Sequence, residues 1–359
     1  MRLEGNMQAR SSLLLALFII FSIFAAPQQS PTQSPASTPQ ASRGISIDVV
    51  VTNKSGKAIP GLQQQDFALL DDKQTQPIVS FQAFDGTGTS SPPQQAIFLI
   101  DAVNTGYQSV EFERQQLQKY LQQNASGLPL PTSLVVLSDA SAQIQPVPTR
   151  DAKALMQALD NNQTGLRSIG RAQGFYGGVE RVQLSLDTLG RLAAYEKSQP
   201  GRKLLIWLSP GWPLLSGPEV QLSKKAQQGI FNTIVALSAS LREARMSVYS
   251  IDPLGMADAA TGRTVYYKSF VKGVTSPGRV DNGDLGLQVI ATQTGGQVLN
   301  SSNDLTSLMS QCLEDAKAYY TISFTSPPAD GPNEYHNLQI KIDKPGLTAR
   351  TRTGYYAQP

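Results

Sequence analysis

The stretch FLIDAVNTGYQS, residues 98–109, decides the fold of this chain because it joins a buried strand to a helix through a polar turn. The apolar run of residues 96–100 ends at Asp101, and Thr105 follows four residues later. Helical spacing of apolar side chains then begins in VEFERQQLQKYLQQN, residues 110–124. A strand followed by a helix in this way is typical of an α/β unit, and it leaves a carboxylate at the carboxyl end of the strand.

The same alternation of strands and helices continues to residue 318. Apolar strands are predicted in TSLVVLSD, RKLLIWLSPG and MSVYSIDP, with segments of helical spacing between them. The segment AQIQPVPT is predicted to be an edge strand, because its two prolines cannot donate to a neighbour on both sides. Crossovers of this length predict a doubly wound, mostly parallel sheet with helices on both faces over residues 94–318.

Both flanks of this block show the period-two pattern of β-strands. Residues 44–90 contain ISIDVVVTN, DFALLDD and QPIVSFQAF, and residues 319–359 contain YYTISF, HNLQIKID and TARTRTGYYA. Three strands of this size are marginal alone. We therefore expect a β-sandwich formed by N- and C-terminal strands together; two separate β subdomains are the alternative.

The N-terminus has the composition of an export signal. Residues 1–26 combine two arginines with a short apolar run, which is typical of a signal peptide. Residues 27–43 are a linker rich in Pro, Ser and Gln that cannot form a core. The chain is therefore predicted to be exported, as a periplasmic, cell-surface or secreted protein. Contact with a membrane is expected only through the signal segment, if it is not cleaved.

Composition excludes several classes of function. Charged residues make up 16% of the chain and the formal net charge is +3, so no basic surface for nucleic acid is expected. Cys312 is the sole cysteine and forms no intrachain disulfide. His336 is the sole histidine, and no Gly-x-Ser-x-Gly elbow accompanies it for a hydrolase triad. A zinc site built from clustered Cys and His is excluded by the same count.

The order of these landmarks resembles the von Willebrand factor A-related proteins known mostly from Acidobacteria. The resemblance covers residues 45–357, and it implies an exported protein with a von Willebrand A-like, Rossmann-type α/β domain and no assigned activity. It rests on IDVVVTNKSGKAIPGLQQQDFALLDD, FLIDAVNT, GRKLLIWLSPGWP, MSVYSIDPLG, IATQTGGQVLNSSNDL and the tail strands YYTISF, YHNLQIKIDKPGLTARTRTGYYA.

The resemblance also implies a metal-ion-dependent adhesion site at the strand ends, with Mg²⁺ or Mn²⁺ as the ion. Asp101 and Thr105 match two of the five ligands of that site. Val103 and Pro210 stand where two further oxygen ligands are needed, and Thr164 is only a candidate for the fifth. The site is therefore expected to be degenerate, with Asn104 or Asp252 as substitutes. The alternative is structural, with Asp101 capping its own turn.

The predicted function is an exported module for protein–protein or cell-surface interaction, independent of metal or with the degenerate adhesion site. Its partner is an unidentified protein or surface ligand. Alternatives are a structural part of an envelope complex and, against the residue counts above, an envelope hydrolase. The contact face is predicted in loops 102–107, 164–178, 210–218 and 253–284. Its candidate contact residues are Asn104, Tyr107, Tyr176, Ser209, Trp212 and Asp252.

Overall fold

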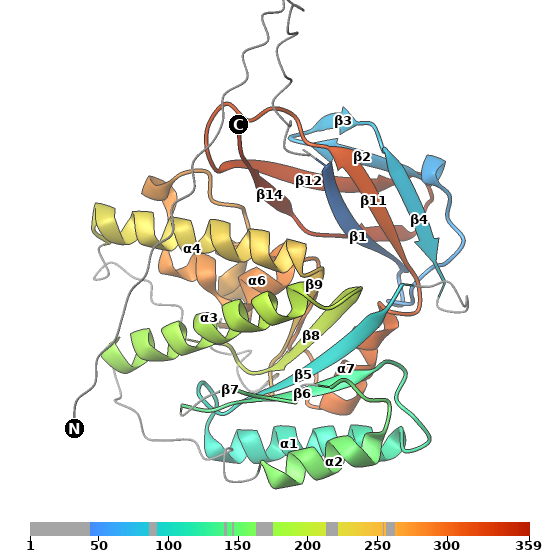
Figure 1. Ribbon diagram of the computed structural model, residues 1–359, viewed down its shortest axis with the longest axis vertical. Coiled ribbons are helices and arrows are strands. Elements are labelled where there is room, and N and C mark those ends of the chain that lie inside the picture. The colour runs from blue at the N-terminus through green and yellow to red at the C-terminus, as the bar shows by residue number, and fades with distance from the viewer. Residues whose placement is uncertain are drawn as a thin grey trace, which may run out of the picture. The chain divides into compact units, whose positions relative to one another are not determined.

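The computed structural model describes residues 44–85, 92–139, 142–145, 147–162, 175–212, 222–253, 255 and 263–359. The predicted signal peptide and linker, residues 1–43, lie outside the described residues. Figure 1 shows the arrangement of the described elements.

A six-stranded sheet forms the centre of the α/β layer. Its strand order is β10-β9-β8-β5-β6-β7, and every neighbouring pair is parallel except β6 and β7. The antiparallel strand lies at the edge, where the prolines that follow it are tolerated. The strands are β5 (Gln94–Asp101), β6 (Thr132–Leu137), β7 (Ala142–Ile144), β8 (Arg202–Leu208), β9 (Met246–Ile251) and β10 (Val298–Leu299).

Helices cover both faces of this sheet (Figure 1). On β8, Leu204 and Ile206 face one helical layer, whereas Leu205 and Trp207 face the other. Burial on both faces explains why the central strands are continuously apolar. The first layer holds α1 (Tyr107–Gln123), α2 (Ala152–Asn161) and α7 (Leu305–Glu314), and the second holds α3 (Phe175–Lys197), α4 (Lys224–Glu243) and α6 (Leu287–Gln293).

Short helices occupy the segments between the larger elements. The α-helical turn α5 (Arg263–Tyr266) comes between β9 and α6. The described 3₁₀ helices are η1 (Gln64–Asp66), η4 (Tyr267–Ser269), η5 (Pro277–Arg279) and η6 (Asn282–Leu285).

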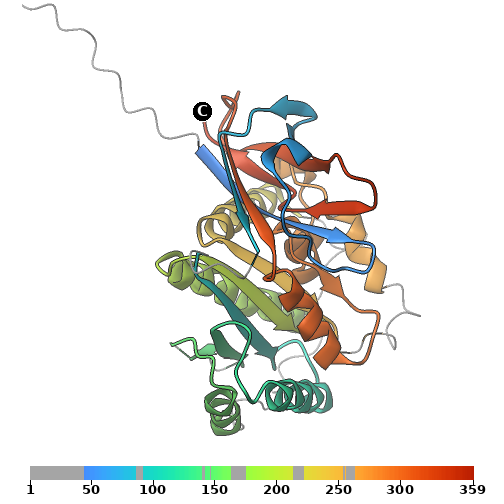
Figure 2. The same ribbon diagram turned by 90° about the vertical axis from the view of Figure 1, so that its right-hand side faces the viewer.

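Two antiparallel four-stranded sheets combine strands from both ends of the chain. One has the order β13-β1-β11-β4 and the other β14-β12-β2-β3. Figure 2 shows N-terminal strands in blue beside C-terminal strands in red. Their bounds are β1 (Gly44–Asn53), β2 (Phe67–Asp71), β3 (Gln74–Gln76), β4 (Ser80–Phe84), β11 (Tyr319–Thr325), β12 (Glu334–Ile342), β13 (Leu347–Arg350) and β14 (Gly354–Ala357).

The predicted fold class needs correction. We expected a von Willebrand A-like, Rossmann-type doubly wound fold with an attached sandwich. Instead the chain mixes α and β, because the two antiparallel sheets hold eight of the fourteen described strands and the third sheet carries an antiparallel edge. The prediction was based on the local alternation in residues 94–318. It made the alternating block decide the class of the whole chain, whereas most of the described strands come from the flanks and pair antiparallel.

A buried ion pair joins the strands of the C-terminal segment to the α/β layer. Asp315, directly after α7, is 1% exposed at its side chain, and one of its oxygens accepts from Arg350 at 2.5 and 3.1 Å. The Tyr249 hydroxyl of β9 donates to the same oxygen at 2.5 Å, and Arg202 of β8 donates to the Asp315 carbonyl. Arg350 is therefore the cation that compensates a carboxylate removed from water.

We expect Arg350→Met to lower the free energy of unfolding by about 3 kcal/mol, because it leaves the buried Asp315 without a cation. Guanidinium denaturation measures the change. Lys317→Met is the matched control, since Lys317 is 66% exposed in its pair with Glu314 and its loss costs less than about 1 kcal/mol. Equal effects of the two substitutions would contradict a structural role for the buried pair.

Candidate functional site

The carboxylate of Asp101 is the centre of the polar cluster at the strand ends. Asp101 is completely buried, and its Oδ1 accepts from the backbone N–H groups of Val103 and Asn104, both at 3.0 Å. Its Oδ2 accepts from Asn104 Nδ2 at 2.8 Å, Trp207 Nε1 at 3.0 Å and Ser209 Oγ at 2.9 Å. Five donors thus hold one carboxylate, which caps the turn after β5.

Neighbouring strands bring these donors together. The parallel register pairs Leu99 of β5 with Trp207 of β8, so Ser209 comes level with the end of β5. Asn104 also donates to the Ser185 hydroxyl of α3 at 2.8 Å. The cluster therefore ties β5, β8 and α3 to one turn.

Glu113 lies buried near this cluster, and the sequence analysis did not single it out. It is 0% exposed on α1, and neither of its carboxyl oxygens has a hydrogen-bond partner in the part of the chain that the structure describes. Burial raises the pKa of Glu113 well above its ordinary value, and the charges of Asp101 and Asp252 raise it further. Glu113 is therefore held as the neutral acid. Its helical spacing from Val110 and Leu117 was the available signal, because it places a carboxyl on the apolar face.

The structure gathers five of the predicted site residues at this edge but closes them off from solvent. Asp101 and Ser209 are completely buried, and Thr105 and Asp252 are each 5% exposed. Asn104, partly buried, turns its amide toward Asp101.

Magnesium requires open oxygen ligands, and this edge does not present them. The oxygens of Asp101 are already engaged by five donors, and Thr105 offers a single buried hydroxyl. The geometry therefore does not support the predicted degenerate adhesion site.

Trp212 was predicted to be an exposed contact residue, and this prediction was wrong. It is 3% exposed, its ring packs edge-on against Trp207 at 5.4 Å, and its Nε1–H donates to the Leu285 carbonyl at 2.9 Å. The chain turns back at Gly211, where φ is +82° and a Cβ would lie 2.9 Å from the Gln288 side chain. Glycine at this position therefore lets the tryptophan fold inward.

Parts of the predicted contact face lie outside the described residues. These parts are the Tyr176 side chain, Thr164 with the loop to residue 174, residues 213–218, residue 254 and residues 256–262.

Exposed apolar side chains occur beside the closed cluster. Tyr107, the first residue of α1, is 55% exposed, and Val179 in the first turns of α3 is 42% exposed. Val265 and Tyr266 of α5 are 52% and 43% exposed. Each residue either follows a strand of the central sheet or begins a helix that leads into one. The topology thus places Tyr107 and Val179 on the carboxyl edge of the sheet, whereas Val265 and Tyr266 lie in the connection between β9 and α6.

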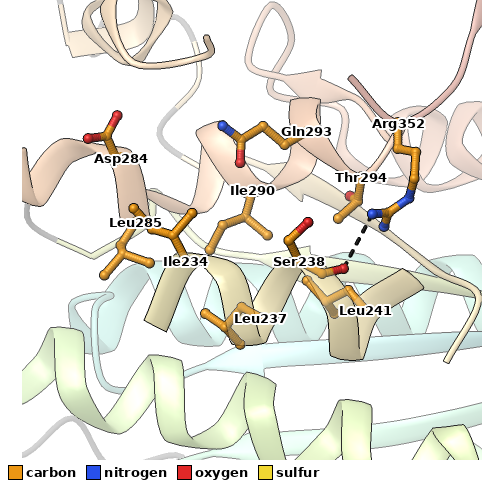
Figure 3. A pocket seen from close by; sticks show the side chains of 10 residues that line it. All are labelled: Ile234, Leu237, Ser238, Leu241, Asp284, Leu285, Ile290, Gln293, Thr294 and Arg352. Atoms are coloured by element: carbon orange, nitrogen blue, oxygen red, sulfur yellow. Dashed lines mark hydrogen bonds between the residues drawn. The ribbon is translucent and has the colours of Figure 1, made fainter. Parts of the chain in front are cut away.

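A small cavity lies between α4 and α6 (Figure 3). Its volume of about 20 Å³ suits water rather than an organic ligand. Arg352 lines one end and donates to the Ser238 carbonyl at 3.3 Å; burial and the charge of Arg242 lower its pKa to about 10. Asp284 lines the cavity as well, and burial raises its pKa to about 6. The cavity therefore does not supply a substrate site.

Comparison with known proteins gives matches among solved structures alone. No protein-family model and no curated protein matches the chain. It is similar to the PilB minor pilin from Streptococcus sanguinis, with 11% identity, a TM-score of 0.38 and coverage of 64% of this chain and 63% of the pilin. It is also similar to three N-terminal domains of the type V pili tip protein Mfa5 from Porphyromonas gingivalis, with 10% identity, a TM-score of 0.35 and coverage of 87% and 66%.

A third similar structure is the human COPII-coat protein Sec24c, with 10% identity, a TM-score of 0.35 and coverage of 77% of this chain and 46% of that one. The chain thus spans less than two thirds of the length of each of these three structures. Likenesses at these TM-scores carry no inference about what the chain binds.

Asp101→Asn is expected to lower the free energy of unfolding by about 3 kcal/mol or more. The amide replaces one acceptor oxygen with a donor, which faces buried donors that have no other partner. Chemical denaturation measures the change. Ser209→Ala is the comparison, because it removes one donor at a cost of about 1 kcal/mol. If Asp101→Asn is no more costly than Ser209→Ala, Asp101 is not the anchor of this edge.

Glu113→Gln is expected to stabilise the protein increasingly as the pH rises. The pKa of Glu113 is higher in the folded than in the unfolded protein. Its contribution to the free energy of unfolding is therefore complete at pH values below the unfolded pKa, and it is lost as the pH rises through the folded pKa. Between the unfolded and the folded pKa, the free energy of unfolding of the wild type falls by up to about 1.4 kcal/mol per pH unit relative to that of the variant. The variant does not show this fall, because Gln has no proton to lose.

Thermal unfolding between acidic and mildly alkaline pH tests this expectation. Glu111→Gln is the control on the same helix, since Glu111 is 29% exposed and faces Arg114 at 3.7 Å. A pH-independent difference between Glu113→Gln and the wild type would show that Glu113 is ionised in the folded state.

Proposed function

We propose that the chain is an exported binding module that contacts a protein or surface ligand without a metal ion. The observation that carries this proposal is the pairing of a closed polar cluster with exposed apolar side chains at the same sheet edge. Polar groups that already satisfy one another hold a surface rigid and leave little capacity for chemistry. Exposed Tyr and Val side chains beside them provide the contact area that protein interfaces use.

The export part of the proposal rests on the sequence of residues 1–26. In the part of the chain that the structure describes, no helix has both the length and the apolar character needed to span a membrane. We therefore propose that the folded region is presented in the periplasm, at the cell surface or outside the cell.

A binding role is favoured over a hydrolytic one by the positions of the two most reactive side chains. Cys312 is 0% exposed within α7, and burial raises its pKa well above the ordinary value, which keeps the thiol protonated and unreactive. His336 is 5% exposed and lies in the antiparallel sheets. Neither side chain reaches an open surface in the described residues.

Tyr107→Ser is expected to weaken binding of the natural partner about tenfold, because an exposed aromatic at an interface contributes roughly 1–2 kcal/mol. Full-length wild type and variant are immobilised, exposed to envelope extract, and compared by quantitative mass spectrometry. The partner so identified is then purified and titrated against both proteins, with and without EDTA.

Tyr195→Ser is the matched control, because Tyr195 is 39% exposed near the far end of α3. Equal binding by the wild type and Tyr107→Ser would remove the strand-end edge as the contact face. Binding abolished by EDTA would reject the metal-independent mode. A partner that stays bound through every purification step, rather than exchanging, would indicate a permanent structural part of an envelope complex.

A further inference from the structure

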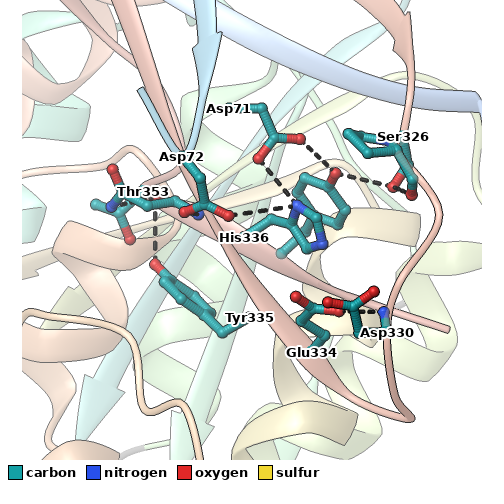
Figure 4. Close-up of polar contacts among 11 residues, drawn as sticks. Asp71, Asp72, Ser326, Asp330, Glu334, Tyr335, His336 and Thr353 are labelled. Atoms are coloured by element: carbon teal, nitrogen blue, oxygen red, sulfur yellow. Dashed lines mark hydrogen bonds and ion pairs between the residues drawn. The ribbon is translucent and has the colours of Figure 1, made fainter. Parts of the chain in front are cut away.

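Two adjacent aspartates and the sole histidine meet in the antiparallel sheets (Figure 4). Asp71 ends β2, Asp72 begins the turn to β3, and His336 lies on the neighbouring strand β12. His336 Nδ1 is 3.0 Å from Asp71 Oδ1 and 3.6 Å from Asp72 Oδ2. One ligand atom from each residue lies within 4.8 Å of the other two. Three potential metal ligands from distant parts of the chain thus converge on one point.

The charge of this cluster calls for a cation. Among the described residues, His336 is the ion-pair partner of both Asp71 and Asp72, and no Lys or Arg pairs with either carboxylate. The side chains of Asp71 and His336 are only 1% and 7% exposed. His336 Nε2 is buried and has no hydrogen-bond partner among the described residues, so the polar contacts of the ring that the structure describes run through Nδ1 into the cluster. A cation beside the buried Asp71 would offset the removal of its carboxylate from water.

Surrounding groups hold each carboxylate with one oxygen turned outward and the other turned toward His336. The Tyr355 hydroxyl donates to Asp71 Oδ2 at 2.7 Å and is itself 2.8 Å from the Ser326 hydroxyl. The Asn337 backbone N–H donates to the outward Asp72 Oδ1 at 3.0 Å. The His336 ring stacks on Tyr355 with centroids 5.0 Å apart. Metal ligands are commonly oriented by outer hydrogen bonds of this kind.

We propose that Asp71, Asp72 and His336 form a binding site for a divalent transition metal, with Zn²⁺ as the best fit. A tetrahedral zinc ion with bonds of about 2.0 Å separates its ligand atoms by about 3.3 Å. The two His336 distances lie on either side of that value. One imidazole nitrogen with two carboxylate oxygens is a donor set that suits zinc. The Asp72 side chain is 54% exposed, which gives an ion and a water ligand access from solvent.

The ion would clamp the β2–β3 turn to β12. Asp72 holds a φ of +46° in that turn, a conformation that Asp and Asn adopt more readily than most residues. The count of cysteine and histidine excluded a zinc site made from those residues alone, and the fold supplies carboxylates in their place.

The test is a titration of the full-length, tag-free protein with Zn²⁺ after chelator treatment, followed by calorimetry and by thermal unfolding. We expect saturable binding of one ion, with a melting temperature that rises with free Zn²⁺. Asp72→Asn should weaken binding at least about tenfold. Asn suits the positive φ and keeps an oxygen for the Asn337 N–H, so the variant should fold. Asp343→Asn, which removes the same charge from an exposed position, should bind like the wild type.

Co²⁺ provides an independent readout, because a low-symmetry site with a histidine ligand gives visible absorption that His336→Gln should abolish. The absence of heat and of any thermal shift up to millimolar Zn²⁺ would overturn the proposal, and so would equal affinity in Asp72→Asn. These outcomes do not depend on partner binding through Tyr107, so the two proposals fail separately.

Discussion

The conformation of the strand-end edge depends on one buried carboxylate that is fully satisfied by its neighbours. Asp101 ends a strand in the middle of the central sheet, where water cannot replace a missing hydrogen bond. Its five donors come from its own turn and from β8, so strand pairing and loop conformation are fixed by the same group. A carboxylate with all its hydrogen bonds satisfied fixes the conformation of the turn after β5 and has no oxygen left for a ligand. The exposed side chains at this edge are therefore carried on a rigid backbone.

Glu113 and the Asp71–Asp72–His336 cluster represent opposite solutions to the burial of acidic groups. Among the described residues, no cation contributes to the pKa of Glu113, and burial favours its neutral acid. The aspartate pair in the antiparallel sheets has a histidine within ion-pair distance and a route to solvent along Asp72. The Asp71–Asp72–His336 cluster therefore favours binding of a cation, whereas Glu113 is stable in the interior only in its uncharged form.

Local patterns in the sequence predicted most of the individual elements. The apolar runs at residues 96–100 and 204–208 are strands, and the helical spacing in residues 110–124 corresponds to α1. The fold class was wrong because the alternation in residues 94–318 was taken to decide the class of the whole chain, whereas eight of the fourteen described strands lie in antiparallel sheets. Trp212 was misplaced because its inward turn depends on Gly211 and on a carbonyl more than seventy residues away. Asp101 was identified from its position, yet its role depends on Trp207 and Ser209, whose approach requires the parallel register.

The pairing of the two ends of the chain affects the order in which the protein is completed during synthesis. β1 is made first but has its main partners in β11 and β13, which are made last. The six strands of the central sheet lie between them in sequence and can pair as soon as they have all emerged. Until β11 and β13 are made, β1 exposes unpaired backbone edges, which are prone to pair with strands of other chains. A newly made chain therefore stays dependent on protection from aggregation until β11 and β13, within residues 319–350, are available.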